Sequence, residues 1–431
     1  MKKNIKTILI LAALIPVFIH EALVLYAIVK NSYKTFEKFD LLIFVVLTLY
    51  LGCLFLFREN KEQLVRLILI TYSLILSIFL CEQYLRLKPE AYIPWPRIHR
   101  ISYAATGVMP GIDGKIELSV NNLNLRGPEV DIEKKDIRIL VAGGSTAECL
   151  YVSDKLTWPW RLQDKLADRL GKKVFVGNAG RSGHFTLNHM ELLRNYRWAN
   201  KFDWVIMLVG INDMGTLLRR NYEIRSQANI KTVSARGKIY YRDMKLFAKC
   251  RNAFLNYFCL ETVLQDPSGR WFDTARQMRK KALENRAIDR LPEGLDESVR
   301  VYKSNLKKII DMCKVRDQKL LMLTQPSMWR KDLPPDLEEL LWQHNGPGEA
   351  YTTEALGKIL DVYNSALIEV CRQEGIPYVD LASMLPKDTS VFYDGCHYNI
   401  SGCEMIAEIL AKEMTAIYQN GKNASDPKDV M

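Results

Sequence analysis

Hydrophobic residues are concentrated at the start of the chain, in three runs separated by short polar segments. The runs cover about 7–29, 41–57 and 64–85, and the second holds no charged residue. A helix needs about 20 mostly apolar residues to cross about 30 Å of hydrocarbon. The pattern therefore predicts a membrane anchor of three transmembrane helices over residues 1–85. A cleaved signal peptide is the alternative, because lysines precede the first run, but two further hydrophobic runs follow it.

Beyond the anchor, residues 86–135 are polar and contain three prolines before residue 97, which predicts a juxtamembrane connector. Short apolar runs then alternate with longer segments of helical periodicity. The predicted strands are 137–142, 173–176, 204–209, 320–323 and 378–381, and the predicted helices are about 156–170, 186–200, 297–314, 353–374 and 400–419. Such alternation indicates parallel βαβ units. We therefore predict a three-layer α/β/α sandwich with a five-stranded, mainly parallel sheet over 136–420, followed by a disordered tail at 421–431.

Composition excludes several classes of protein and shows one unusual segment. With 431 residues, 48% of them hydrophobic, and only nine cysteines, the chain is neither disordered nor a small disulfide scaffold. Most of its net charge of +11 lies in residues 215–292, which hold 17 Lys and Arg against seven acids. This basic insertion suits an anionic membrane surface or substrate, or it is simply a solvated cap. A membrane anchor argues against nucleic acid as the partner.

The charges that flank the predicted spans only weakly favour one side of the membrane for the catalytic domain. If the N-terminus is cytoplasmic, six Lys and Arg flank the spans on that side and seven on the other, so the charge bias is almost balanced. The N-terminal lysines favour an extracytoplasmic catalytic domain. Seven cysteines beyond Cys81 argue for the opposite side.

Candidate chemistry lies where the predicted strands end, which is where ligands bind in open α/β sheets. Ser145 follows two glycines after the first strand, although on this segment alone a helix cap is the better interpretation. Gly183 follows the second strand, and Asn212 follows the third, where it could donate its amide to an anion or form a turn. Asp394 and His397 share one loop before the last predicted helix, a spacing that suits a base and its orienting carboxylate.

Taken together and in this order, the segments Gly143-Gly144-Ser145-Thr146, Gly183, Gly210-Ile211-Asn212-Asp213 and Asp394-Gly395-Cys396-His397 resemble the SGNH/GDSL hydrolase superfamily. The resemblance implies that Ser145 is the nucleophile, His397 its general base and Asp394 the residue that orients the base. It also implies an oxyanion hole formed by the N–H groups of Ser145 and Gly183 and the side chain of Asn212. No cofactor is implied.

The chain departs from the family's pattern in two respects. The aspartate before the nucleophile is Gly144 and the leucine after it is Thr146, and the basic insertion separates Asn212 from the next helix. The upstream segment 121–127 is similar to a lead-in of membrane-anchored members, and the sequence assigns it no role.

Other residues could take part in the chemistry. His184 and His189 are alternative bases, and His184 could contact substrate. No Cys/His spacing resembles a zinc motif, so no metal site is predicted. Cys149 and Cys396 flank the candidate site in sequence and are interpreted as buried structural thiols.

The leading hypothesis is a membrane-anchored serine esterase that cleaves an acyl ester, such as an acetyl ester, of a lipid or cell-envelope glycan. An O-acyltransferase with the same side chains is the second hypothesis, because an alcohol can replace water in resolving an acyl-serine. The third is a non-catalytic membrane scaffold that keeps the fold.

Overall fold

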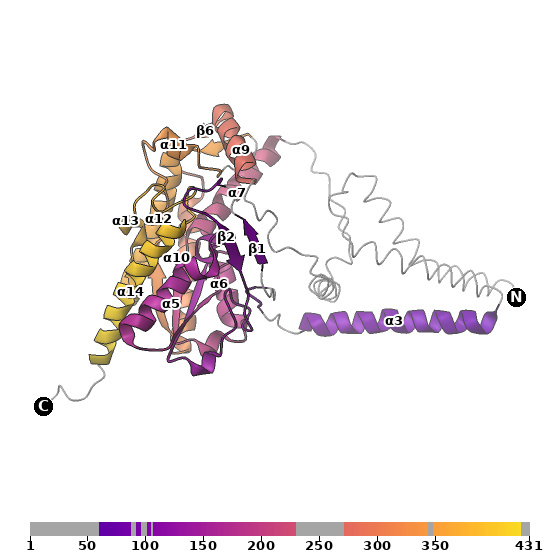
Figure 1. Cartoon of the computed structure of the whole chain (residues 1–431). Helices are drawn as coiled ribbons and strands as arrows, with labels where there is room; N and C mark the ends of the chain where they lie inside the picture. Colours follow the sequence, from indigo (N-terminus) through magenta and orange to yellow (C-terminus); the bar gives the residue numbers. More distant parts are fainter. Residues whose placement is uncertain are drawn as a thin grey trace. The chain divides into compact units, whose positions relative to one another are not determined.

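The structure is a computed structural model, and it describes residues 60–87, 92–95, 101–104, 107–229, 271–343 and 348–423. The chain divides into two compact units, Met1–Glu90 with Thr232–Thr262, and Ala91–Lys231 with Val263–Met431. Figure 1 shows the helices and strands of both units.

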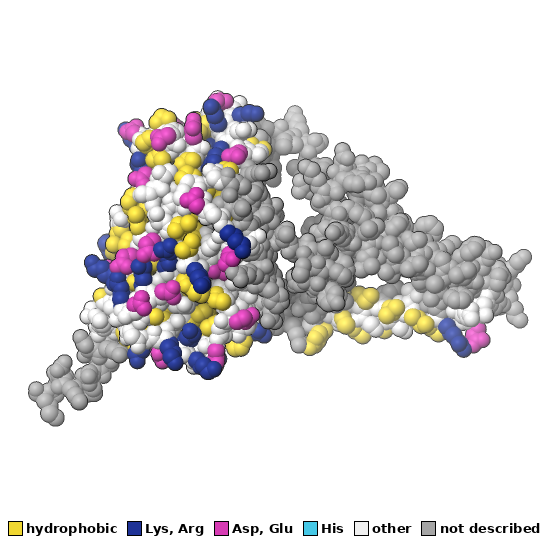
Figure 2. Space-filling model, viewed as in Figure 1, with side chains coloured by type: hydrophobic (Ala, Val, Ile, Leu, Met, Phe, Trp, Pro, Cys, Tyr) yellow, Lys and Arg dark blue, Asp and Glu magenta, His cyan; other side chains and the backbone are white. Residues whose placement is uncertain are grey.

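In the first unit the described element is helix α3 (Lys61–Leu87). Hydrophobic side chains lie along this helix, and large ones such as Leu69, Leu74 and Phe79 are exposed (Figure 2). In the part of the chain that the structure describes, no helix is long and apolar enough to span a membrane. The predicted span at 64–85 falls within α3, so this finding does not support it. The predicted spans at 7–29 and 41–57 lie outside the described residues.

The second unit is built on a five-stranded sheet. Its strands are β3 (Ile137–Gly143), β4 (Val174–Asn178), β5 (Trp204–Leu208), β7 (Lys319–Leu323) and β9 (Tyr378–Val379), in the order β4-β3-β5-β7-β9. Neighbouring strands are parallel throughout. The predicted five-stranded parallel sheet is therefore confirmed. Its last strand is shorter than predicted, because Leu381 begins helix α13 (Leu381–Met384).

Helices cover both faces of this sheet. They are α5 (Trp158–Leu170), α6 (Thr186–Asn195), α10 (Leu295–Val315), α12 (Thr353–Glu374) and α14 (Ile400–Asn423). Right-handed crossovers in this strand order put α5 on one face and α6, α10 and α12 on the other. The packing agrees, because α5 contacts α14, whereas α10 contacts α6 and α12 (Figure 1). Helix α6 ends before the predicted residue 200, since Tyr196 leaves the helical conformation and its hydroxyl bonds the Leu123 carbonyl.

Shorter elements surround this sandwich. They are β1 (Ile101–Ala104), β2 (Lys115–Leu118), η2 (Ile132–Lys134), α4 (Ser145–Glu148), η3 (Asp154–Leu156), η4 (Ala199–Lys201), α7 (Ile211–Asn229), α9 (Trp271–Asn285), β6 (Ala287–Ile288), α11 (Pro335–Glu338) and β8 (Ala350–Tyr351). Part of the predicted connector packs into the domain, because Ile116, Leu123 and Leu125 belong to its hydrophobic core. Helix α14 runs into the predicted tail as far as Asn423, and residues 424–431 lie outside the described residues.

Candidate active site

Ser145 lies at the carboxyl end of β3, where it is the first residue of α4. The N-cap position belongs to Gly144, so the interpretation of Ser145 as a helix cap is wrong. The chain is tightly packed at this corner. A Cβ on Gly143 would lie 2.6 Å from the Cβ of Ala147, and a Cβ on Gly144 would lie 2.2 Å from Nδ2 of Asn212. The second contact gives a physical reason for glycine where the family's segment has aspartate.

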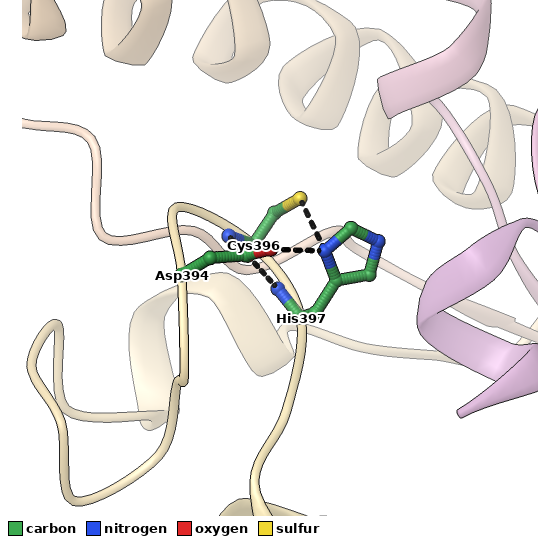
Figure 3. Close-up of side chains that lie close together, drawn as sticks. All are labelled: Asp394, Cys396 and His397. Atoms are coloured by element: carbon green, nitrogen blue, oxygen red, sulfur yellow. Dashed lines mark hydrogen bonds and ion pairs between the residues drawn. The ribbon is translucent and has the colours of Figure 1, made fainter. Parts of the chain in front are cut away.

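The structure brings Ser145, His397 and Asp394 together, although 252 positions separate the serine from the histidine. His397 Nε2 lies 2.7 Å from Ser145 Oγ, and His397 Nδ1 lies 2.7 Å from Asp394 Oδ2. Asp394 and His397 lie on the loop before α14, with the imidazole Nδ1 turned towards the carboxylate (Figure 3). Because an ionised carboxylate only accepts hydrogen bonds, Nδ1 carries the proton and Nε2 can accept the serine hydroxyl.

The carboxylate of Asp394 is completely buried and fully hydrogen bonded. Its Oδ1 accepts the main-chain N–H groups of Cys396 and His397, each at 2.8 Å. Its Oδ2 accepts Nδ1 of His397 and, at 2.8 Å, the indole N–H of Trp342. Burial by itself would raise the pKa of Asp394, but the charge of His397 and the hydrogen bonds from residues 396 and 397 hold it below its usual value. The group is therefore a stable anion at neutral pH.

That anion controls the basicity of His397. Burial disfavours a charged imidazole, but the negative charge of Asp394, together with Cys396 and the hydrogen bonds to these two residues, outweighs it, so the pKa of His397 is raised well above its usual value of 6.5. The rings of Tyr393 and Trp342 lie almost parallel to the imidazole, with centroids 5.6 and 6.3 Å away. A base with a raised pKa and a fixed orientation is well suited to accept the proton of Ser145.

The two other oxyanion candidates lie on neighbouring segments. Asn212 is in the first turn of α7, and its Nδ2 donates to the main-chain oxygen of His184 at 2.8 Å. An amide nitrogen carries two hydrogens, so one donor remains for a substrate oxygen. Gly183 has a left-handed backbone with φ of +77°. Its neighbour Ser182 donates to the buried carboxylate of Glu148, which joins this loop to α4.

The alternative bases, His184 and His189, are both held neutral by burial. His184 Nδ1 lies 3.0 Å from the hydroxyl of Tyr92, and burial lowers the pKa of His184 to about 4. His189 is buried, which lowers its pKa to about 3. Both imidazoles are therefore neutral and weakly basic. His397 is the histidine whose ring nitrogen is bonded to Ser145, which makes it the stronger candidate.

Asp394, Cys396 and His397 form the one set in the described part of the chain whose ligand atoms could hold a metal ion, all within 4.8 Å of one another. The Cys396 Sγ lies 3.7 Å from Nδ1 of His397 (Figure 3). Burial raises the pKa of the Cys396 thiol, and Nδ1 already bonds the carboxylate. Metal ligands must be deprotonated, whereas this thiol is neutral and Nδ1 of His397 is hydrogen bonded to Asp394. The three side chains therefore fit an acid–base pair better than a metal site.

Aromatic side chains enclose the acid–base pair through contacts that sequence reasoning did not predict. Trp342 bonds Asp394, and it contacts Trp271 edge-on with centroids 5.1 Å apart. Phe272 lies against Tyr151 and Tyr393. Trp271 and Phe272 begin α9, so the end of the basic insertion packs beside the site. No spacing in the sequence signals these contacts, because they join segments about 50 to 120 positions apart.

Comparison with known proteins identifies the class. The model of the GDSL-like Lipase/Acylhydrolase family matches residues 141–405. A hydroxyl, an imidazole and a carboxylate at the carboxyl edge of a parallel sheet are the groups of a serine-hydrolase site. The family match narrows this class to one family. The chain belongs to the GDSL-like lipase/acylhydrolase family, and it is a hydrolase of ester bonds. No curated protein matches it in sequence.

Several solved structures are similar to part of this chain. An α/β hydrolase from the Lake Arreo metagenome is 14% identical, with 65% of this chain and 96% of that chain covered and a TM-score of 0.37. An acetylxylan esterase from Geobacillus stearothermophilus is 14% identical, with 65% and 94% covered and a TM-score of 0.36. A putative lipolytic protein of the G-D-S-L family from Desulfitobacterium hafniense is 9% identical, with 64% and 99% covered and a TM-score of 0.34.

Proposed function

We propose that the protein is a serine esterase that cleaves an acyl ester through an acyl-serine intermediate. The observation that carries the proposal is the chain of two 2.7 Å contacts from Ser145 Oγ through the imidazole of His397 to Asp394. A serine hydroxyl is a poor nucleophile until an adjacent base accepts its proton. His397 is that base, and Asp394 stabilises the imidazolium that forms.

The reaction has two stages, acylation of Ser145 and hydrolysis of the acyl-serine. Ser145 Oγ attacks the ester carbonyl while His397 Nε2 takes its proton, and the tetrahedral intermediate places its negative oxygen on the N–H groups of Ser145 and Gly183 and the amide of Asn212. The intermediate collapses, the alcohol leaves with the proton from His397, and the acyl group stays on Ser145. Water then repeats the sequence, with His397 as its base, and releases the acid.

We further propose that the enzyme is a multi-pass membrane protein whose hydrophobic runs at 7–29, 41–57 and 64–85 anchor it, with the catalytic domain outside the cytoplasm. Support comes from the three runs of the sequence and from the exposed hydrophobic side chains of α3. A site close to a bilayer favours an acyl ester of a lipid or a cell-envelope glycan as substrate, and the basic insertion suits the anionic surface there.

The test of the catalytic proposal uses the full chain in detergent with p-nitrophenyl acetate and a fluorophosphonate probe. We expect ester hydrolysis, and covalent labelling that peptide mass spectrometry assigns to Ser145. The Ser145→Ala protein serves as the matched control. Hydrolysis by that variant at the wild-type rate, or no labelling of the wild type, would refute the proposal. Membrane anchoring is checked by resistance of the protein to alkaline carbonate extraction, and the side by protease accessibility in intact cells.

A further inference from the structure

We propose that Arg126 is a positioning residue for this reaction. It holds helix α4 and the loop 178–184 in register, and so it fixes Ser145 relative to the N–H group of Gly183. The inference rests on the proposed function, in which these two segments supply the nucleophile and the main-chain oxyanion donors. It assigns a role to the segment 121–127, for which the sequence suggests none.

The first set of contacts joins Arg126 to the segment that follows the nucleophile. The guanidinium is buried, with its side chain 2% exposed. It donates to three main-chain carbonyl oxygens in this turn, those of Glu148, Cys149 (2.6 Å) and Val152. Helix α4 has four residues, and its C-cap residue, Cys149, has a left-handed φ of 53°. The last carbonyls of a helix lack partners within it, and a cation beside them is favourable.

The second set of contacts joins the same residue to the loop that carries Gly183. The main-chain N–H of Arg126 donates to the carbonyl oxygen of Asn178 at 3.0 Å. The Asn178 amide in turn donates to Ala147 O of α4 at 2.8 Å, and its Oδ1 accepts the N–H of Gly180 at 2.8 Å. A Cβ on Gly180 would lie 2.4 Å from the main-chain nitrogen of Glu148. The two segments are therefore in direct backbone contact, with Arg126 bonded to both.

Arg126 is itself held in place before substrate arrives. Its Nε donates to Asp154 at 2.9 Å. The turn that precedes it is closed by Asn121, whose Oδ1 accepts the N–H groups of Leu123 and Leu125. The indole N–H of Trp95 donates to the carbonyl of Gly180, so a further hydrogen bond holds the loop 178–184 in place. Positioning by buried and fully bonded groups is what keeps a catalytic geometry from relaxing.

The experiment compares Arg126→Lys with Arg138→Lys in the full chain. Arg138 offers a matched control, because it also pairs with an aspartate, Asp203 at 2.6 Å, but at the opposite end of β3. Lysine keeps the charge and loses the planar set of donors that reaches several carbonyls at once. For Arg126→Lys we expect kcat on p-nitrophenyl acetate to fall about 10- to 100-fold with KM little changed, since a displacement of about 1 Å can cost about 100-fold. The Arg138→Lys protein should keep the wild-type kcat.

Hydrogen–deuterium exchange supplies a readout that does not depend on turnover. The amides of 145–152 and 178–184 should lose protection in Arg126→Lys but not in Arg138→Lys. A folded Arg126→Lys protein with wild-type kcat and wild-type exchange, or an equal loss of kcat in both variants, overturns the inference. If Arg126→Lys does not fold, Asn178→Ala takes its place, and wild-type kcat in that variant overturns it equally. Failure of the proposed function is distinct, because it shows as an unlabelled wild-type Ser145.

Discussion

The two ends of strand β3 use polar residues in different ways. At its amino end, Arg138 and Asp203 form an ion pair whose side chains are 28% and 37% exposed. Near its carboxyl end, Asp394 is completely buried and Arg126 almost so, and each is bonded on several sides. An exposed pair contributes little to stability, whereas a buried charge is tolerated only when its partners are complete. Substitutions should therefore be mild at the amino end and damage the chemistry at the carboxyl end.

The largest effect should come from Ser145→Ala and His397→Ala. Each removes one half of the 2.7 Å contact on which nucleophilic attack depends. We expect kcat to fall by about a million-fold, with the double variant no worse than either single one, since such residues act as a unit. Steady-state hydrolysis, with circular dichroism to show that the variants are folded, checks this. Additive losses would show that the two side chains act separately.

The second largest effect should come from Asp394→Asn, which we expect to reduce kcat by about 10,000-fold, because a neutral amide no longer fixes the tautomer of the base. Steady-state hydrolysis measures this loss.

The same substitution should also change the pH profile of kcat/KM. Attack needs neutral His397, so kcat/KM of the wild type should rise with pH around a midpoint above 6.5, in line with the raised pKa of His397. Without the charge of Asp394, which raises this pKa, the midpoint should move to lower pH. A midpoint that stays in place would contradict this account.

Asn212→Ala should follow, with a loss of about 100- to 1,000-fold in kcat, as is typical when one oxyanion donor is removed. Its KM should change little, because the donor contributes mainly when negative charge develops on the substrate oxygen. The affinity of a boronic acid inhibitor, which forms a tetrahedral adduct with a serine, should fall in parallel. Unchanged inhibitor affinity would assign Asn212 to the structure of the loop.

Trp342→Phe is expected to have a smaller effect. It keeps an aromatic ring beside His397 but removes the indole N–H that lies 2.8 Å from Asp394 Oδ2. A hydrogen bond to a charged group contributes about 1.5 kcal/mol, so kcat should fall about 10-fold. Trp329→Phe is a suitable control, because Trp329 is buried and its indole N–H has no hydrogen-bond partner among the described residues. Equal losses in both variants would point to packing as the cause.

Arg138→Lys should have the smallest effect, at the amino end of the strand. We expect the free energy of unfolding to fall by less than about 1 kcal/mol, because the pair with Asp203 is partly exposed and screened by water. Urea denaturation measures this loss, and turnover on the same sample measures kcat. A loss of kcat comparable to that of Arg126→Lys would remove the contrast between the two ends.

The sequence predicts the frame of the domain well, for a physical reason. Buried parallel strands are continuous apolar runs and their helices are amphipathic, so β3, β5 and α12 lie within one or two residues of their predicted bounds. Ser145, His397 and Asp394 are predicted by their positions after strands together with the family resemblance. Helix α6 ends early because Tyr196 takes part in a tertiary contact, which periodicity cannot signal.

The supporting residues are harder to predict, because their roles depend on contacts between distant segments. Arg126 acts on carbonyl oxygens more than 20 positions away, and any carbonyl looks alike in a sequence. Trp342 reaches Asp394 from a loop 52 positions earlier. Periodicity describes which face of an element is buried, but not which polar atoms meet across the domain.

Because Gly144 has no side chain, the Asn212 amide can lie directly against it, and the effects of substitutions at positions 144 and 212 are therefore coupled. A methyl group there would occupy the space of the Asn212 amide, 2.2 Å away, so Gly144→Ala should be harmful chiefly by displacing that donor. Once Asn212 is alanine, the added methyl has little left to displace. The two substitutions should thus be strongly non-additive in a double-mutant cycle. A search for the tripeptide Gly-Asp-Ser would therefore miss chains of this kind, in which glycine precedes the serine and a nearby amide fills the space of the aspartate side chain.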